Sequence, residues 1–167
     1  FDGVHLGHRV ILNRMREIAK KTKGESILLT FSPHPRHVLH LDDQDMKLIN
    51  TLDEKQDLLG ESGLDNLVIH EFTKKFSRIK PANFVRDILV ENLKVHTLVI
   101  GHDHHFGHKR EGSPQFLIDY SKSRNFTCKV VEAVADAAVI LSSSHIRQLI
   151  NEGFVRRASF ELGWVYG

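Results

Sequence analysis

The sequence predicts an α/β fold in which a parallel sheet is covered by helices on both sides. Short apolar runs alternate along the chain with segments whose apolar residues recur at helical spacing. The apolar runs lack the polar alternation of a half-exposed strand, which is typical of strands buried on both faces. With 167 residues, of which 41% are hydrophobic, the chain can bury one sizeable core and is expected to form one globular domain.

Each strand is predicted from a short apolar run that ends at turn residues. The run that begins at Ser26, for example, stops where Pro33 and Pro35 interrupt the strand pattern. The predicted strands cover residues 26–31, 66–72, 97–100, 127–134 and 138–141.

The helices have recognisable start and stop signals. Apolar residues recur at helical spacing after His8, and Gly24 is a plausible stop. Thr51 and Glu54 form a capping-box pattern before a helix that runs to about Gly60. A third helix is expected from Pro81, with a core face of Phe84, Val85, Ile88 and Leu89. Three more are expected from Pro114 through Tyr120, from Ser143 or Ser144 to a point before Gly153, and over roughly Val155–Leu162.

Composition limits the classes of function. The net charge is +2 with interspersed signs, which argues against a nucleic-acid-binding domain, and the pI near 8.7 is a weak indication of an anionic ligand. Cys128 is the single cysteine, so there is no disulfide framework and a reducing cytoplasm is expected. No apolar run has the length of a membrane span, and no membrane partner is expected.

Residues 1–8, Phe-Asp-Gly-Val-His-Leu-Gly-His, carry the strongest functional signal. His5 and His8 lie where a helix is predicted to begin, and the free N–H groups of a helix N-terminus favour anions such as a nucleotide triphosphate. Gly3 and Gly7 permit a close approach of the backbone to a ligand. Two histidines three residues apart on a helix are also compatible with a metal site.

Three further segments bear polar chemistry at the predicted carboxyl ends of strands. They follow Phe31, Ile100 and Leu141, and all three are expected to open on the same edge of the sheet as His5 and His8. The first has the sequence Thr-Phe-Ser-Pro-His-Pro-Arg, the second is rich in glycine and histidine, and the third reads Leu-Ser-Ser-Ser-His-Ile-Arg.

Each of these segments also has a simpler interpretation. His34, His37 and His40 have a spacing that zinc could use, although exposed histidines explain it as well. The histidine-rich loop after Ile100 is compatible with metal binding, and three serines before a helix would cap it in any protein. A guanidinium at Arg147, one turn into that helix, can bind the same anion as the capping amides.

Together the four segments resemble the FAD synthetase family of the HxGH nucleotidyltransferase superfamily, in the form of the FMN adenylyltransferase module of bacterial bifunctional riboflavin kinase/FAD synthetases. The match covers essentially the whole chain, in the family's order. Two departures stand out: His102 and His104 occupy positions that are more often acidic and aromatic, and Ser144 replaces the usual threonine.

The resemblance implies a Rossmann-like nucleotidyltransferase fold and the reaction of ATP with FMN to give FAD and pyrophosphate. It implies catalytic roles for His5, His8 and Arg147 and a Mg²⁺ ion that accompanies ATP, with no dedicated metal ligands in the protein. The implied ATP-binding residues are Phe1, Asp2, Gly3, His5, Gly7, His8, Ser143, Ser144 and Arg147, and the implied flavin-binding residues are Phe31, His34, Asp103 and Phe106.

The resemblance also implies a domain organisation. Residues 1–160 correspond to the adenylyltransferase domain, and residues 161–167 to the start of a linker to a C-terminal riboflavin kinase domain. A strand that normally precedes Phe1 would be central to the sheet, so the stability of the domain is expected to depend on it. Two alternatives are kept open: another HxGH nucleotidyltransferase, acting on phosphopantetheine or a pyridine mononucleotide, and a non-enzymatic histidine-rich metal-binding module.

Overall fold

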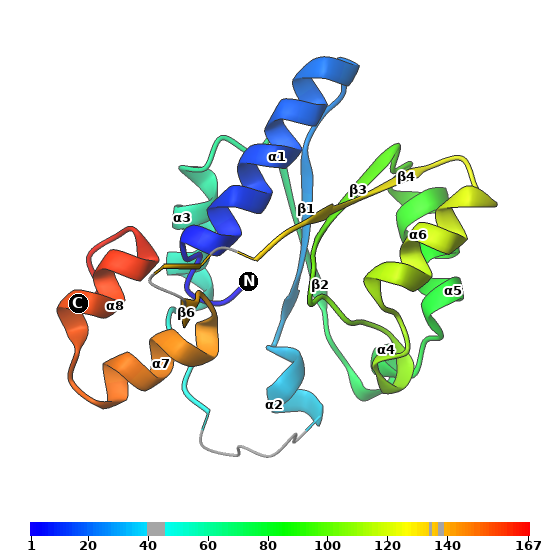
Figure 1. The fold of residues 1–167 in the computed structure, drawn as a ribbon. Coiled ribbons are helices and arrows are strands. Elements are labelled where there is room, and N and C mark those ends of the chain that lie inside the picture. Colours follow the sequence, from blue (N-terminus) through cyan, green and yellow to red (C-terminus); the bar gives the residue numbers. More distant parts are fainter. Residues whose placement is uncertain (40–45, 134, 137–138) are drawn as a thin grey trace.

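The computed structural model describes residues 1–39, 46–133, 135–136 and 139–167, and Figure 1 shows their arrangement. The strands are β1 (Ile27–Ser32), β2 (Asn66–Glu71), β3 (Thr97–Gly101), β4 (Thr127–Val131), β5 (Ala135–Asp136) and β6 (Val139–Ile140). The helices are α1 (Leu6–Thr22), α2 (Pro35–Leu39), α3 (Leu52–Gly60), α4 (Lys74–Ser77), α5 (Pro81–Asn83), the π-helix η1 (Phe84–Asn92), the 3₁₀-helix η2 (His108–Arg110), α6 (Pro114–Lys122), α7 (Ser143–Asn151) and α8 (Val155–Leu162).

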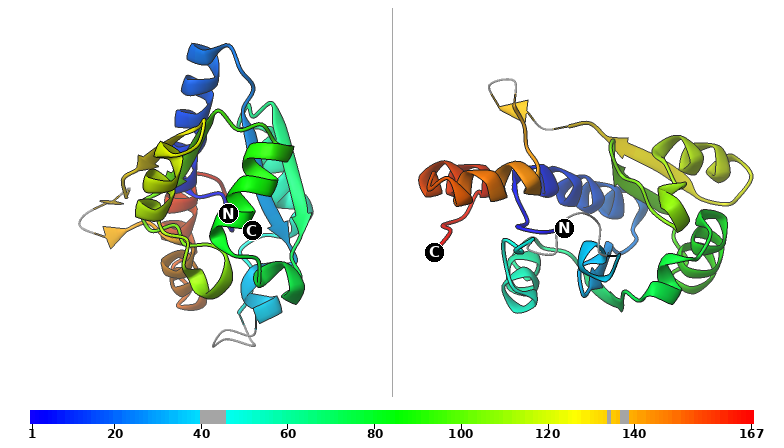
Figure 2. Two further views of the ribbon diagram at one scale, coloured as in Figure 1. Left: turned by 90° about the vertical axis from the view of Figure 1, so that its right-hand side faces the viewer. Right: turned by 90° about the horizontal axis from the view of Figure 1, so that it is seen from below.

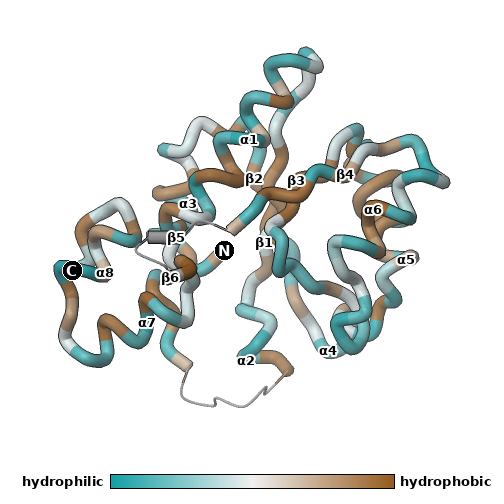
Figure 3. Tube along the Cα trace, in the orientation of Figure 1, coloured by the Kyte–Doolittle hydropathy of each residue, from teal (hydrophilic) through white to brown (hydrophobic). Residues whose placement is uncertain are grey.

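The four longer strands form two parallel pairs, which confirms the predicted α/β class. β1 pairs with β2, and β3 pairs with β4. Among the described residues no strand is hydrogen-bonded between the two pairs, so they do not make one continuous sheet. They nevertheless share a core, because Leu29 of β1 packs against the cluster that contains Ile100 of β3. Figure 3 shows the hydrophobic stretches along β2 and β3 in the middle of the molecule.

The strand predicted over residues 127–134 is shorter than expected. β4 ends at Val131, because its partner β3 ends at Gly101 and the ladder has no further residues to bond. The chain then forms the small antiparallel pair β5–β6, and β6 replaces the longer strand predicted over residues 138–141. Val134 and Ala138, the predicted end and start of those strands, lie outside the described residues.

Most helices begin and end where their capping signals predict. Thr51 caps α3 through both hydrogen bonds of a capping box with Glu54. Ser113 caps α6, and α8 spans the predicted residues. The helix predicted from Pro81 is α5 followed by η1, in which Val85 and Leu89 are buried as expected.

Three short helices had no counterpart in the sequence prediction: α2, α4 and η2. The segment with two prolines after β1 was expected to be a loop, yet it contains α2, where the Nδ1 atom of His34 accepts from the N–H of Arg36 and proline is well tolerated at a helix start. Thr73 caps the single turn of α4 in the same manner.

Two hydrophobic clusters pack the elements around the N-terminus, and one of them contains Val4. Val4 packs with Leu12, Leu28 and Leu59, which lie in α1, β1 and α3. A second cluster joins Ile49 to α7 and α8. Seen from below in Figure 2, α1, α7 and α8 form one row, α2 and α3 lie opposite, and the N-terminus lies between them.

Candidate active site

The N-terminal motif begins with a left-handed turn. Gly3 has a φ of +85°, and a side chain there would place its Cβ 2.9 Å from the Cδ1 atom of Ile49. Val4 follows with a φ of 43° and is 1% exposed. A β-branched residue rarely adopts this conformation, so the surrounding contacts must hold it there. The turn directs the chain into α1.

His5 and His8 lie at the N-terminus of α1, as predicted. His5 is the N-cap residue, and its Nδ1 atom accepts from the N–H of His8 at 3.4 Å. The two imidazole rings stack with a centroid separation of 3.7 Å, and Phe1 stacks on His8 at 4.2 Å. Gly7 leaves room for them, since a Cβ there would lie 3.0 Å from the His5 ring and the ring would have to shift. The motif is therefore a close-packed set of three rings.

Both histidines are neutral at physiological pH. Burial lowers the pKa of His5 to about 4 and holds the pKa of His8 well below its ordinary value. Because Nδ1 of His5 accepts a hydrogen bond, its single proton is assigned to Nε2. Nδ1 of His8 is buried without a hydrogen-bond partner in the described part of the chain.

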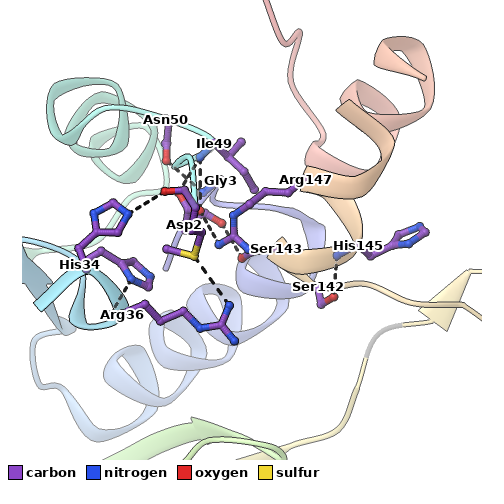
Figure 4. Close-up of polar contacts among 12 residues, drawn as sticks. Asp2, Gly3, His34, Arg36, Ile49, Asn50, Ser142, Ser143, His145 and Arg147 are labelled. Carbon is purple, nitrogen blue, oxygen red and sulfur yellow. Dashed lines mark hydrogen bonds and ion pairs between the residues drawn. The ribbon is translucent and has the colours of Figure 1, made fainter. Parts of the chain in front are cut away.

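A buried ion pair connects the motif to α7 (Figure 4). The carboxylate of Asp2 is 2.9 Å from a terminal guanidinium nitrogen of Arg147 and also accepts from the N–H of Ile49 at 3.1 Å. The hydroxyl of Ser143 donates to the carbonyl of Asp2 at 2.8 Å. These contacts bring the N-terminus of α7, which Ser142 caps, beside the N-terminus of α1.

The site therefore has two helix N-termini with donors beside each other. In α7 the backbone N–H groups of Ser143 and Ser144 make no hydrogen bond among the described residues, and the Ser144 side chain is exposed. Free amides at a helix start favour an anion. This part of the molecule has the chemistry to hold a phosphate chain.

Sequence reasoning missed two residues that hold Gly3. The N–H of Gly3 donates to Oδ1 of Asn50 at 3.0 Å, and the Trp164 indole N–H donates to the carbonyl of Gly3 at 2.9 Å. These partners lie 47 and 161 positions away in the chain, and no local pattern marks them. Lys55 was also missed: its ammonium is 3.5 Å from the hydroxyl of Thr30, and burial lowers its pKa.

Two residues expected on the flavin side lie close to the motif. The charge of Asp2 acts on His34, whose pKa burial lowers to about 4. The charge of Asp103 acts on His5, and the Asp103 side chain is 80% exposed. The charges of the loops after β1 and β3 are thus felt at the histidine motif.

The two phenylalanines expected on the flavin side pack mainly against other rings. Phe31 contacts Phe72 and Phe76 at centroid separations of 5.5 and 5.4 Å. Phe106 contacts Phe84 at 5.4 Å and is paired with Gly112 in a β-bridge. Both rings thus belong to a set of packed aromatic side chains.

The histidine-rich segments do not gather into a metal centre within the described ranges, where no group of three His, Cys, Asp or Glu side chains could hold a metal ion. His37 instead bonds the carbonyl of Met46 at 2.8 Å, and His104 lies against Phe106. His40, the last residue of the predicted zinc spacing, lies outside the described residues.

The fold and the site define an α/β protein with paired imidazoles at one helix start and a serine-arginine helix start beside it. The profile of the FAD synthetase family matches residues 1–145, and the chain belongs to this family. Bifunctional riboflavin kinase/FMN adenylyltransferases from Listeria monocytogenes, Bacillus subtilis and Escherichia coli are 35%, 31% and 31% identical over 98–99% of the chain. The chain spans 52% of the length of each of these relatives.

A solved structure has the same fold. A crystal structure described as a macrolide-efflux protein from Streptococcus pneumoniae superposes with a TM-score of 0.88 and 25% sequence identity, over 99% of this chain and 62% of that one. Among the described residues, no helix has the length and apolar character needed to cross a membrane.

Proposed function

We propose that this chain transfers the adenylyl group of ATP to FMN, giving FAD and pyrophosphate. A phosphate oxygen of FMN forms a bond to the α-phosphorus of ATP, and the bond from that phosphorus to the bridging oxygen of the β-phosphate breaks. Pyrophosphate leaves with that electron pair. The observation that carries the proposal is the pair of neutral imidazoles at the start of α1, held beside the start of α7 by the Asp2–Arg147 ion pair.

The reaction needs positioning and charge stabilisation and no covalent enzyme intermediate. His5 donates through Nε2 to an oxygen of the α-phosphoryl group, and His8 donates to a neighbouring phosphate oxygen. A neutral imidazole donates a hydrogen bond through its N–H and keeps the proton. This suits a step in which no group of the substrates has to be protonated. The low pKa of each histidine thus fits stabilisation of charge better than acid catalysis.

The start of α7 binds the β- and γ-phosphates in this proposal. The free amides of Ser143 and Ser144 supply donors, and Arg147 adds positive charge while one of its nitrogens stays bonded to Asp2. Phe1 and Gly7 belong to the ATP-binding part of the site, where Phe1 stacks on His8 and Gly7 lies against the His5 ring. His34, Asp103, Phe31 and Phe106 line the side from which the flavin enters.

The protein offers no complete cage for Mg²⁺ in the part that the structure describes. Both carboxylate oxygens of Asp2 already accept hydrogen bonds, and no trio of ligating side chains is present there. This donor set fits a Mg²⁺ ion that arrives on the triphosphate and is coordinated by phosphate and water. Its chemistry would be to neutralise phosphate charge.

We also infer the setting of the domain. The relatives' names support a C-terminal riboflavin kinase region beyond this domain, and the single cysteine fits a cytoplasmic enzyme. The packing continues past the expected boundary at residue 160, since Glu161 and Leu162 are 1% and 0% exposed.

The test is incubation with ATP and Mg²⁺ and, separately, FMN, riboflavin or phosphopantetheine, with identification of the product by mass. FAD from FMN alone is expected. Adenylylated phosphopantetheine would place the chain with another nucleotidyltransferase class. The His8→Ala variant should lose most turnover and keep its fold; normal FAD formation by a folded His8→Ala protein would contradict the assignment.

A further inference from the structure

The backbone of Gly3 is held by side chains from two distant parts of the chain, one on its N–H and one on its carbonyl. Asn50 is 5% exposed and accepts from the Gly3 N–H at 3.0 Å, while Trp164 donates to the Gly3 carbonyl at 2.9 Å. Figure 4 shows Asn50 beside Gly3 and Asp2 at the centre of the site. We use the name Gly3 clamp for Asn50 and Trp164.

The orientation of the Gly3–Val4 peptide affects where His5 lies. The Gly3 carbonyl belongs to the peptide that leads into Val4, and Val4 is the single residue between it and His5. Since Val4 has a φ of 43°, its backbone is strained and needs restraint from outside. A free carbonyl would let the turn relax toward an unstrained conformation, and the His5 ring would move with it.

Trp164 is itself held in place by α8. The helix ends at Gly163, whose φ is +75° and where a Cβ would lie 2.7 Å from Cδ2 of Leu6. Leu162 is fully buried, and the N–H of Tyr166 donates to the Ser159 hydroxyl at 3.0 Å. The indole therefore reaches Gly3 from an anchored segment.

A cavity lies beside the Gly3 clamp, next to the hydrogen bond from Trp164 to Gly3. This cavity of about 340 Å³ is lined by both clamp residues together with Ile49, Glu54 and Tyr166. Trp164 packs against the buried cluster of Ile49, Ile146, Ala158 and Leu162, and the bond to Gly3 fixes the direction of its indole N–H. The Nδ2 atom of Asn50 is buried without a partner in the described part of the chain, so the clamp has no spare contact on that side.

We propose that Trp164 is a positioning residue of the adenylyl-transfer site, which acts through the Gly3 carbonyl to hold the His5 ring against the α-phosphate. This inference rests on the proposed function. It assigns to the segment after α8 a role in the chemistry at the start of the chain, 161 positions away. Neither residue of the Gly3 clamp touches a substrate in this proposal.

The test removes the indole N–H and little else. In the complete chain, Trp164 is replaced by 3-benzothienylalanine, which has the shape of tryptophan without the donor, and by phenylalanine as an encoded counterpart. Tyr166→Phe is the matched control, because Tyr166 lies in the same segment and has no hydrogen bond to Gly3. We expect the isostere to lower kcat for FAD formation about fivefold to tenfold, the value of one lost hydrogen bond, with KM for FMN and ATP within about twofold.

A structural readout accompanies the kinetics. The ring resonances of His5 should shift in the isosteric variant and stay unchanged in Tyr166→Phe, with every variant assayed well below its own melting temperature. An unchanged kcat, unchanged His5 resonances, or a loss explained by a smaller folded fraction would overturn the inference. If the unsubstituted chain makes no FAD, the proposed function fails, while the His5 resonances still decide whether Trp164 positions the ring.

Discussion

Replacement of Arg147 by methionine tests the buried ion pair that joins the two helix starts. Methionine has a similar length and keeps much of the packing, but among the described residues the carboxylate of Asp2 would then keep only the N–H of Ile49 as a hydrogen-bond donor. The Asp2 side chain is 4% exposed and the Arg147 side chain 16% exposed, so water cannot replace the lost contact well. Removing one member of such a buried pair typically costs about 3–5 kcal/mol.

That loss is large compared with the stability of a domain, which is about 5–15 kcal/mol. For a chain of this length each kcal/mol shifts the melting temperature by about 2–4 °C, so Arg147→Met should melt about 6–20 °C lower. Circular dichroism at increasing temperature measures the melting temperature of each protein. The control is Arg14→Met, since Arg14 makes an exposed pair with Glu17 and should shift melting by at most about 4 °C. Equal melting of Arg147→Met and the unsubstituted protein would show that the pair does not hold α7 to the motif.

Three further predictions concern the motif and one helix cap. Burial lowers the pKa of His5 from 6.5 to about 4, so as the pH falls the unfolded chain binds a proton at His5 before the folded chain does. The free energy of unfolding should therefore be highest above about pH 6.5 and fall toward pH 4, with at most about 3 kcal/mol of the loss due to His5. Urea unfolding of His5→Asn should show a smaller loss over that interval, whereas an equal loss would refute the shift. Gly7→Ala should depress kcat by displacing the His5 ring, while Gly60→Ala, where a Cβ meets nothing within 4 Å, should leave turnover unchanged; the idea fails if both variants turn over normally. Thr51→Ala should destabilise the protein by about 1 kcal/mol in chemical denaturation through loss of the capping box, and an unaltered denaturation midpoint would count against that cap.

Local signals in the sequence determined most of the secondary structure. The capping box at Thr51, the serine caps of α6 and α7, and the apolar runs of β1 to β3 act over a few residues, so they could be identified without tertiary information. The end of β4 could not, because it depends on the length of β3. The helical turn of α2 was missed because a proline pair was interpreted as a loop.

The sequence also indicated that the N-terminal motif and the serine-rich helix start belong to one site, and the contacts of Asp2 with Ser143 and Arg147 bring these two segments together. It indicated His5, His8 and Ser143 by their place at helix starts. The protonation state of the two histidines was not predictable, because their low pKa comes from burial by residues far away in the chain.

What only the tertiary structure decided is how the motif is held. Arg147 looks like a free anion-binding side chain in the sequence, yet in the fold it is paired with Asp2 across 145 positions. Trp164 has no functional pattern around it and still donates to Gly3. The physical reason is the same in both cases: a strained turn needs partners for its buried polar groups, and those partners come from wherever the fold brings donors, which no local pattern in the sequence records.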